Sequence, residues 1–249
     1  MPHIVVIIQC STPSDKCLLM SKLSAAVRRF TLTWLWLSLL CFCGPARAEY
    51  SPGGLDFSLQ VGHNETRWEY AGQILTSKSS FIGIQLRETL APRLRGSLQA
   101  GYLDLSQPGN PLPAARVTTG YYGGVDLTLL LLDATRLTME LTGGYRYQET
   151  QGHDSGTDVE LVWHDTYAQL ELVMPLSERL DLRTLGGTSR TSGEQRARGD
   201  TDQLLTFDEQ RQSYYAAGLA YWLDETGYLS VSWLGGAYDG FQFGFHRGF

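Results

Sequence analysis

Apolar and polar side chains alternate one by one over much of the chain from residue 49 onwards. The alternation is clearest at 55–62, 82–87, 94–101, 137–142 and 241–249. A period of two places the apolar side chains on one face of a β-strand, whereas a helix needs a period of 3.6. No stretch of 49–249 is long and apolar enough for a transmembrane helix. The pattern therefore predicts an all-β fold.

Residues 20–48 have the composition of an export signal. Arg28 and Arg29 precede an apolar run at 32–43, and Ala46-Arg47-Ala48 follows it as a small-x-small cleavage site. This order predicts a secretory signal peptide that is removed from the mature chain. We expect translation to begin at Met20, so that residues 1–19 are a spurious upstream extension; a long n-region is the alternative. Residues 49–249 then form the mature domain.

Removing the first 48 residues changes the composition of what is left to fold. All four Cys, at positions 10, 17, 41 and 43, are lost, so no disulfide, thiol nucleophile or Cys-based zinc site is expected. Two Lys, three Arg and one acidic residue leave as well, which gives 15 basic and 25 acidic side chains and a net charge of −10. This balance excludes a basic nucleic-acid-binding protein.

Two folds accommodate strands that have one apolar face. A soluble sandwich buries that face, and an outer-membrane barrel turns it towards lipid. The connections favour the barrel, because short turns at 91–93, 133–136, 177–179 and 224–227 alternate with longer polar segments at 65–79, 106–115, 150–158 and 190–208. Barrels show this asymmetry between periplasmic turns and extracellular loops. Aromatic residues near the strand ends are typical of interfacial girdles; they are Trp68, Tyr70, Tyr121, Tyr145, Tyr147, Trp163, Tyr214 and Trp233.

The last ten residues, GFQFGFHRGF, carry aromatic side chains at alternate positions, namely Phe241, Phe243, Phe245 and Phe249. This ending resembles the signal by which the barrel-assembly machinery recognises outer-membrane proteins, although Arg247 stands where a hydrophobic residue is usual. With the signal peptide, the chain resembles small Gram-negative outer-membrane barrel proteins as a class, with no specific family. The resemblance implies a bacterial outer-membrane location with periplasmic termini, and the assembly machinery, membrane lipid and lipopolysaccharide as partners.

Four periplasmic turns predict the number of strands. With both termini periplasmic they give a closed antiparallel up-and-down transmembrane β-barrel of about ten strands, and eight is the alternative because the loop at 235–239 is very short. Within 158–174 the alternation changes phase. Val159, Leu161 and Trp163 face one way, and Ala168, Leu170 and Leu172 face the other. A β-bulge near 164–166 would explain the change.

The polar phase of the strands predicts a belt of charged side chains inside the barrel. Its members lie near periplasmic turns or the chain end; they are Arg87, Arg95, Glu140, Glu171, Arg183 and His246. Opposite charges in a confined lumen are expected to pair, because an unpaired buried charge is costly. We expect a salt-bridge plug in a narrow barrel, with an ion-selective constriction as the alternative.

Several residues have side chains that are common in catalytic sites, but the sequence gives no complete catalytic set for any of them. His63 and Glu65 share one face at the outer end of the first strand, where outer-membrane proteases and lipid A deacylases place catalytic groups, but the sequence does not identify the Ser or Asp partner that such a site needs. His164 and Asp165 are adjacent in a strand, so their side chains should point to opposite faces. We interpret His63, Glu65 and His164 as weak catalytic candidates and expect no enzyme activity.

Two loops contain motifs that arise often by chance. His153, Asp154 and Asp158 could bind a metal opportunistically, but we expect a solvated loop. Arg198-Gly199-Asp200 matches a tripeptide used in integrin binding. We therefore expect no metal and no cofactor. The predicted role is structural, surface-interacting or that of a narrow channel; an enzyme acting on lipid A or peptides at the outer rim, or an adhesin, are the alternatives.

Overall fold

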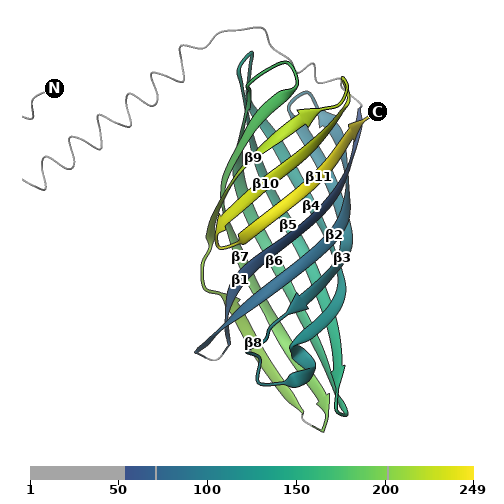
Figure 1. Cartoon of the computed structure of the whole chain (residues 1–249), viewed down its shortest axis with the longest axis vertical. Coiled ribbons are helices and arrows are strands. Elements are labelled where there is room, and N and C mark those ends of the chain that lie inside the picture. Colours follow the sequence, from purple (N-terminus) through teal and green to yellow (C-terminus); the bar gives the residue numbers. More distant parts are fainter. Residues whose placement is uncertain (1–53, 71, 201) are drawn as a thin grey trace, which may run out of the picture. The chain divides into compact units, whose positions relative to one another are not determined.

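The computed structural model describes residues 54–70, 72–200 and 202–249, and the predicted signal peptide and upstream extension lie outside them. The described part is a β-barrel with one short 3₁₀ helix, η1 (Pro113–Ala115) (Figure 1). Its strands are β1 (Leu55–Tyr70), β2 (Gln73–Ala91), β3 (Leu94–Ser106), β4 (Val117–Ala134), β5 (Leu137–Asp154), β6 (Thr157–Pro175), β7 (Leu180–Gly199), β8 (Gln203–Glu209), β9 (Ser213–Trp222), β10 (Gly227–Gly236) and β11 (Asp239–Gly248). No helix among these residues is long and apolar enough to cross a membrane.

Every strand pairs antiparallel with its neighbours, and β11 returns to pair with β1. The closing ladder runs from Asp56↔Gly248 to Glu65↔Asp239, and it brings Leu55 and Phe249 to the same end of the barrel. Short turns join the strands at this end, as the sequence predicts. The ring formed by β1 to β7 with β9, β10 and β11 has ten strands, which confirms the predicted closed barrel.

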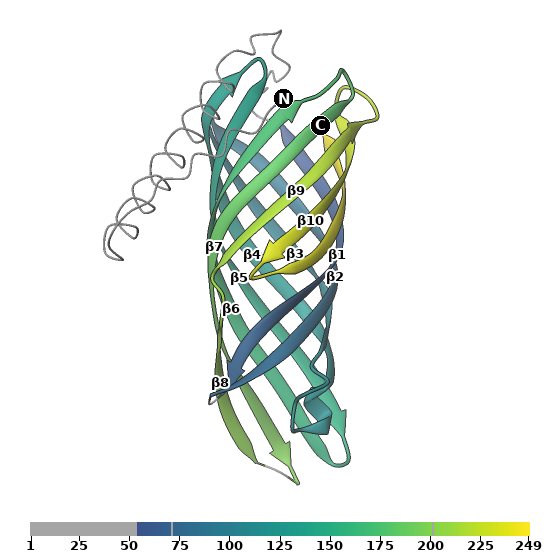
Figure 2. The ribbon, with the colours of Figure 1, turned by 60° about the vertical axis from the view of Figure 1, so that its left-hand side comes forward.

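A second, smaller ring closes the other end. There β8 pairs with β7 on one side and with Trp68–Tyr70 of β1 on the other, so the wall consists of β1 to β8 only. The step arises because the β10–β11 hairpin ends partway along the barrel (Figure 2). Residues 210–212 separate β8 from β9 at this step. The sequence predicts one strand over 206–223; the structure divides it in two, because its two parts have different neighbours.

The wall around the ten-strand ring is apolar on the outside. Its outward side chains are Leu, Ile, Val, Phe, Tyr and Trp residues with exposed fractions from about two-fifths to two-thirds, among them Leu59, Ile82, Leu98, Leu127 and Phe243. So many large apolar side chains on one continuous band would be unfavourable in contact with water. A band of this kind is the lipid-facing surface of a transmembrane barrel. We call this region the apolar band.

Beyond the apolar band the polarity of both faces inverts. In β6, Val159, Leu161 and Trp163 point inward and are buried, whereas Leu170 points outward. The pairing of β6 with β5 and with β7 is continuous, so the predicted bulge at 164–166 is wrong. The phase changes because the solvent changes: lipid surrounds the wall near Leu170, and water surrounds it near Leu161.

The same inversion corrects two further predictions. The segments at 65–79, 150–158 and 190–208 are largely strands that continue beyond the apolar band, while 106–115 is the expected irregular segment apart from its first residue. Most of their outward side chains are polar, with Ile74 and Leu204 as exceptions, so the sequence lacks the continuous membrane-facing signal of a strand. Of the residues assigned to the aromatic girdle, Trp68, Tyr70, Trp163 and Tyr214 are buried inside the barrel.

Candidate functional site

The residues of the predicted charge belt face the lumen of the ten-strand ring. Arg95 Nη2 lies 2.5 Å from Glu140 Oε1, and both side chains are 9% exposed. Arg183 Nε donates to Glu171 Oε1 at 2.7 Å, and its Nη1 donates to the Tyr228 hydroxyl at 2.6 Å. These contacts lie across β3 and β5, and across β6, β7 and β10. They therefore cross-link the wall from inside.

The other two members of the belt are His246 and Arg87. His246 Nδ1 lies 2.8 Å from the Ser58 hydroxyl and its Nε2 lies 3.1 Å from that of Ser230. The His246 ring stacks on Tyr228, with 4.3 Å between the ring centroids. Arg87 is the cross-strand partner of Asp56, and its buried Nε makes no hydrogen bond within the described chain.

A second polar layer surrounds Arg146, on the side of the belt away from the termini. Arg146 Nη2 donates to Gln99 Oε1 at 3.2 Å, and the guanidinium carbon lies 5.5 Å and 5.9 Å from the ring centroids of Tyr122 and Tyr167. Tyr167 in turn donates to Asp126 at 3.4 Å. Cation–π contacts and hydrogen bonds thus hold a buried cation in the middle of the lumen.

A third layer contains two buried carboxyl groups at the level of the step. The Thr191 hydroxyl lies 2.7 Å from Asp165 Oδ1 and 3.0 Å from Glu209 Oε2. Gln148 also donates to Asp165, at 2.5 Å, and Ser189 donates to Glu209 at 3.1 Å. Glu209 Oε1 has no hydrogen-bond partner in the described chain. Sequence reasoning did not single out Glu209, because β8 lies outside the apolar band and gives no alternation to follow.

The outer mouth is filled by an apolar core that the sequence reasoning missed. Trp68 stacks on Phe207 with 4.5 Å between ring centroids and meets Trp163 edge-on at 5.2 Å. The core is sealed by the segment at 107–116, whose Ala114 and Ala115 are 3% and 0% exposed. Its buried side chains touch one another; they are Trp68, Tyr70, Leu103, Leu105, Ala114, Ala115, Tyr122, Val159, Leu161, Trp163, Ala197 and Phe207.

Amide side chains fix the sealing segment in place. Asn110 donates to the side-chain oxygens of Gln107 and Gln195, at 2.9 Å and 2.8 Å. Gln107 also donates to Ser77 at 2.7 Å and to Tyr70 at 3.0 Å. All five side chains are buried, so these hydrogen bonds tie the segment to β1, β2 and β7. The change of phase in β6 is the signal in the sequence that could have revealed this core.

The weak catalytic candidates do not come together. His63 contacts the Ser80 hydroxyl at 2.9 Å, and Glu65 pairs with Lys78 at 2.6 Å, both on the outside of β1 and β2. His164 is on the outside of β6 and lies 2.5 Å from the Tyr145 hydroxyl. Since β1 and β6 are not neighbours in the sheet, these groups face different directions. Asp165 points inward, as strand geometry predicts.

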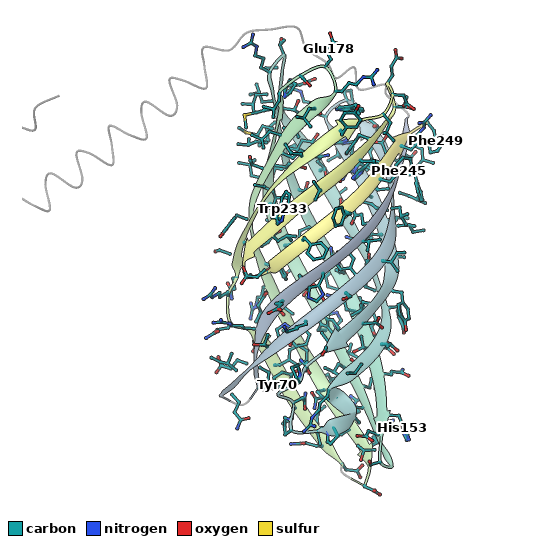
Figure 3. All side chains as sticks on the ribbon, viewed as in Figure 1. Tyr70, His153, Glu178, Trp233, Phe245 and Phe249 are labelled. Atoms are coloured by element: carbon teal, nitrogen blue, oxygen red, sulfur yellow. The ribbon has the colours of Figure 1, made fainter. Side chains whose placement is uncertain are left out.

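The two loop motifs lie at the tips of neighbouring hairpins. His153 Nδ1 is 2.6 Å from Asp158 Oδ1 on the surface of the β5–β6 hairpin, at the end far from Phe249 (Figure 3). Arg198 and Gly199 end β7, and the Asp200 amide donates to the Gly156 carbonyl at 3.3 Å. Among the described residues no group of three or more His, Cys, Asp or Glu side chains is arranged to hold a metal.

The aromatic residues of the C-terminal strand face outward. Phe241 and Phe243 are 42% and 53% exposed, and their rings meet edge-on at 5.7 Å. Phe249 is 79% exposed at the end of the barrel where β1 begins, and Phe245 lies just below it in Figure 3. Arg247, which departs from the usual pattern, pairs with Asp224 of the β9–β10 turn at 2.6 Å.

Solved barrel structures resemble this chain only distantly. An outer-membrane channel from Pseudomonas putida F1 has a TM-score of 0.46 at 12% identity, over 84% of this chain and 100% of the other. The outer-membrane protease OmpT from Escherichia coli has 0.43 at 12%, over 80% and 94%. Ail, the attachment invasion locus protein of Yersinia pestis, has 0.40 at 11%, over 80% and 100%. No family model and no curated protein matches the chain. Likeness at this level assigns no activity.

The class of protein follows from the construction of the barrel itself. An apolar outer wall, a polar lumen and a ring of antiparallel strands define the outer-membrane β-barrels of bacteria, and this chain is a protein of that class. The short turns mark the end with Leu55 and Phe249 as periplasmic, and the longer hairpins mark the other end as extracellular.

Proposed function

We propose that this protein is a closed outer-membrane barrel with a structural or surface-interaction role, and that its lumen does not conduct. The observation that carries the proposal is the apolar core in the extracellular half. Leu161, Leu105 and Phe207 in that core are at most 2% exposed, so packed side chains occupy the path that an ion would need. An ion crossing this region would also lose its hydration without gaining polar partners.

The extracellular half would then serve as a rigid platform. Its β5–β6 and β7–β8 hairpins extend beyond the sealing segment at 107–116, where they can meet other molecules (Figure 1). Ion pairs such as Lys78–Glu65 and Arg196–Glu194 lie on its outer surface. A polar outside around an apolar inside makes this half resemble a soluble β-barrel mounted on a membrane-embedded one.

Planar-bilayer recording with the purified protein tests this proposal. We expect no stepwise conductance above the lipid baseline in concentrated KCl, at either polarity, because the core does not depend on voltage or salt. A known open porin inserted under the same conditions is the control for detection. Regular conductance steps from a correctly folded, heat-modifiable protein would contradict the proposal and favour the narrow channel.

A further inference from the structure

The step between the two rings leaves a ledge on the outside of the barrel. A ring of ten strands is wider than a ring of eight. The wall therefore recedes where the β10–β11 hairpin ends, at residues 235–239 (Figure 2). The hairpin tip is fixed, because the Ala237 amide donates to the Ser213 carbonyl at 2.9 Å and the Tyr238 hydroxyl donates to Ser189 at 3.1 Å. We call this step, with the side chains around it, the ledge.

Aromatic side chains line the membrane side of the ledge. Trp233 and Tyr215 are 59% and 64% exposed, and Phe241 is the cross-strand partner of Trp233. Tyr215 lies across Gly235, where an added β-carbon would come within 2.5 Å of the ring. Figure 3 shows Trp233 on the side of the barrel, well away from both ends. Aromatic rings at such a position occupy the boundary between acyl chains and headgroups.

Three arginines lie on the extracellular side of the ledge, on three adjacent segments. Arg67 is on β1, Arg211 is in the link between β8 and β9, and Arg190 is on β7. The Gln210 amide donates to the Arg67 carbonyl at 3.0 Å, and the Ser189 amide donates to the Gln212 carbonyl at 2.7 Å. These backbone bonds hold the three residues in one row across the step.

The three guanidinium groups are available to a ligand. All three residues are exposed, and none makes an ion pair or side-chain hydrogen bond with another residue of the described chain. By contrast, Arg196 pairs with Glu194, and Arg116 donates to the Asn110 carbonyl. Unpaired guanidinium groups beside a membrane boundary suit phosphate, which they bind through paired N–H donors.

We propose that the ledge binds the phosphorylated headgroup of an outer-leaflet glycolipid, lipopolysaccharide, with phosphate on Arg67, Arg190 and Arg211 and acyl chains on the aromatic side chains below. Acidic residues nearby limit the affinity. Glu65 is neutralised by Lys78, while Asp239 at the hairpin tip and the cross-strand neighbours Glu69 of β1 and Asp208 of β8 oppose an anion. The inference goes beyond the proposed function, since it holds whether or not the lumen conducts.

Lipid binding by the detergent-extracted full chain tests the proposal. The probe is bis-phosphorylated lipid A, compared with enzymatically dephosphorylated lipid A and with inorganic phosphate. We expect Arg67→Gln, Arg190→Gln and Arg211→Gln each to weaken lipid A binding about fivefold, because one basic side chain near a membrane surface contributes about that factor. Asp239→Asn should strengthen binding by a similar factor. Each variant is first checked for heat-modifiable migration, so that loss of fold is not read as loss of binding.

Arg198→Gln is the matched control, because Arg198 is exposed on the same strand as Arg190 but lies at the far tip of the β7–β8 hairpin. It should bind lipid A like the unchanged protein. The proposal is overturned if folded ledge variants keep full affinity, if Arg198→Gln loses as much as they do, or if dephosphorylated lipid A binds equally well. Equal affinity for inorganic phosphate would also overturn it, since the ligand would then be a free anion. None of these outcomes depends on conductance.

Discussion

At the scale of single residues, the lumen depends on pairs that are costly to break. Arg95 and Glu140 are each 9% exposed and 2.5 Å apart. Glu140→Gln removes one charge and leaves the other buried, so we expect a loss of about 3–5 kcal/mol in the free energy of unfolding. Urea unfolding of the protein in lipid vesicles measures this loss. The double variant Arg95→Met with Glu140→Met should recover most of it, and failure to recover would show that the pair itself is stabilising.

Asp224, in a turn outside the membrane, makes the stability of the barrel depend on pH. The Thr226 amide and, next, the Arg247 guanidinium lower the pKa of Asp224 from 3.8 to about 2. Since the folded-state pKa is depressed, the stabilisation is present above about pH 4 and is lost as the pH falls through 2. Asp224→Asn should therefore unfold more easily than the unchanged protein at pH 6, and the difference should shrink as the pH approaches 2 and vanish below it. A difference that persists unchanged at pH 2 would exclude this carboxylate as its source.

At the scale of the element, the single strand β6 passes from lipid into water. Leu170 of β6 faces lipid, whereas Val162 faces outward above the apolar band, between its cross-strand partners Glu149 and Glu194. Leu170→Arg should destabilise the barrel by about 2–4 kcal/mol, the cost of a basic residue on the lipid face. Val162→Arg should change the stability by no more than about 0.5 kcal/mol. Equal effects of the two substitutions on vesicle unfolding would contradict the inversion of polarity along β6.

At the scale of the whole molecule, the two rings differ in their surroundings and in what fills them. The ten-strand ring lies in the membrane and carries the polar lumen, while the eight-strand ring lies outside and carries the apolar core. Closure of the mouth needs β1, β2, β3, β4, β6, β7, β8 and the segment at 107–116 together. For this reason conductance is the appropriate test of closure, because it reports on the assembled barrel rather than on any one contact. The ledge likewise exists only where both rings meet.

The sequence by itself determined the fold class and the turns of the periplasmic end, and it predicted about ten strands with eight as the alternative. All of these follow from a local period of two and from turn residues close together in the chain. Tertiary structure decided which strand meets which at the step, and hence the second ring, the ledge and the apolar core. Trp68 and Phe207 are far apart in the sequence, and the alternation around each is the same whether its apolar face meets lipid or another side chain. Only the closed barrel fixes which of the two it meets.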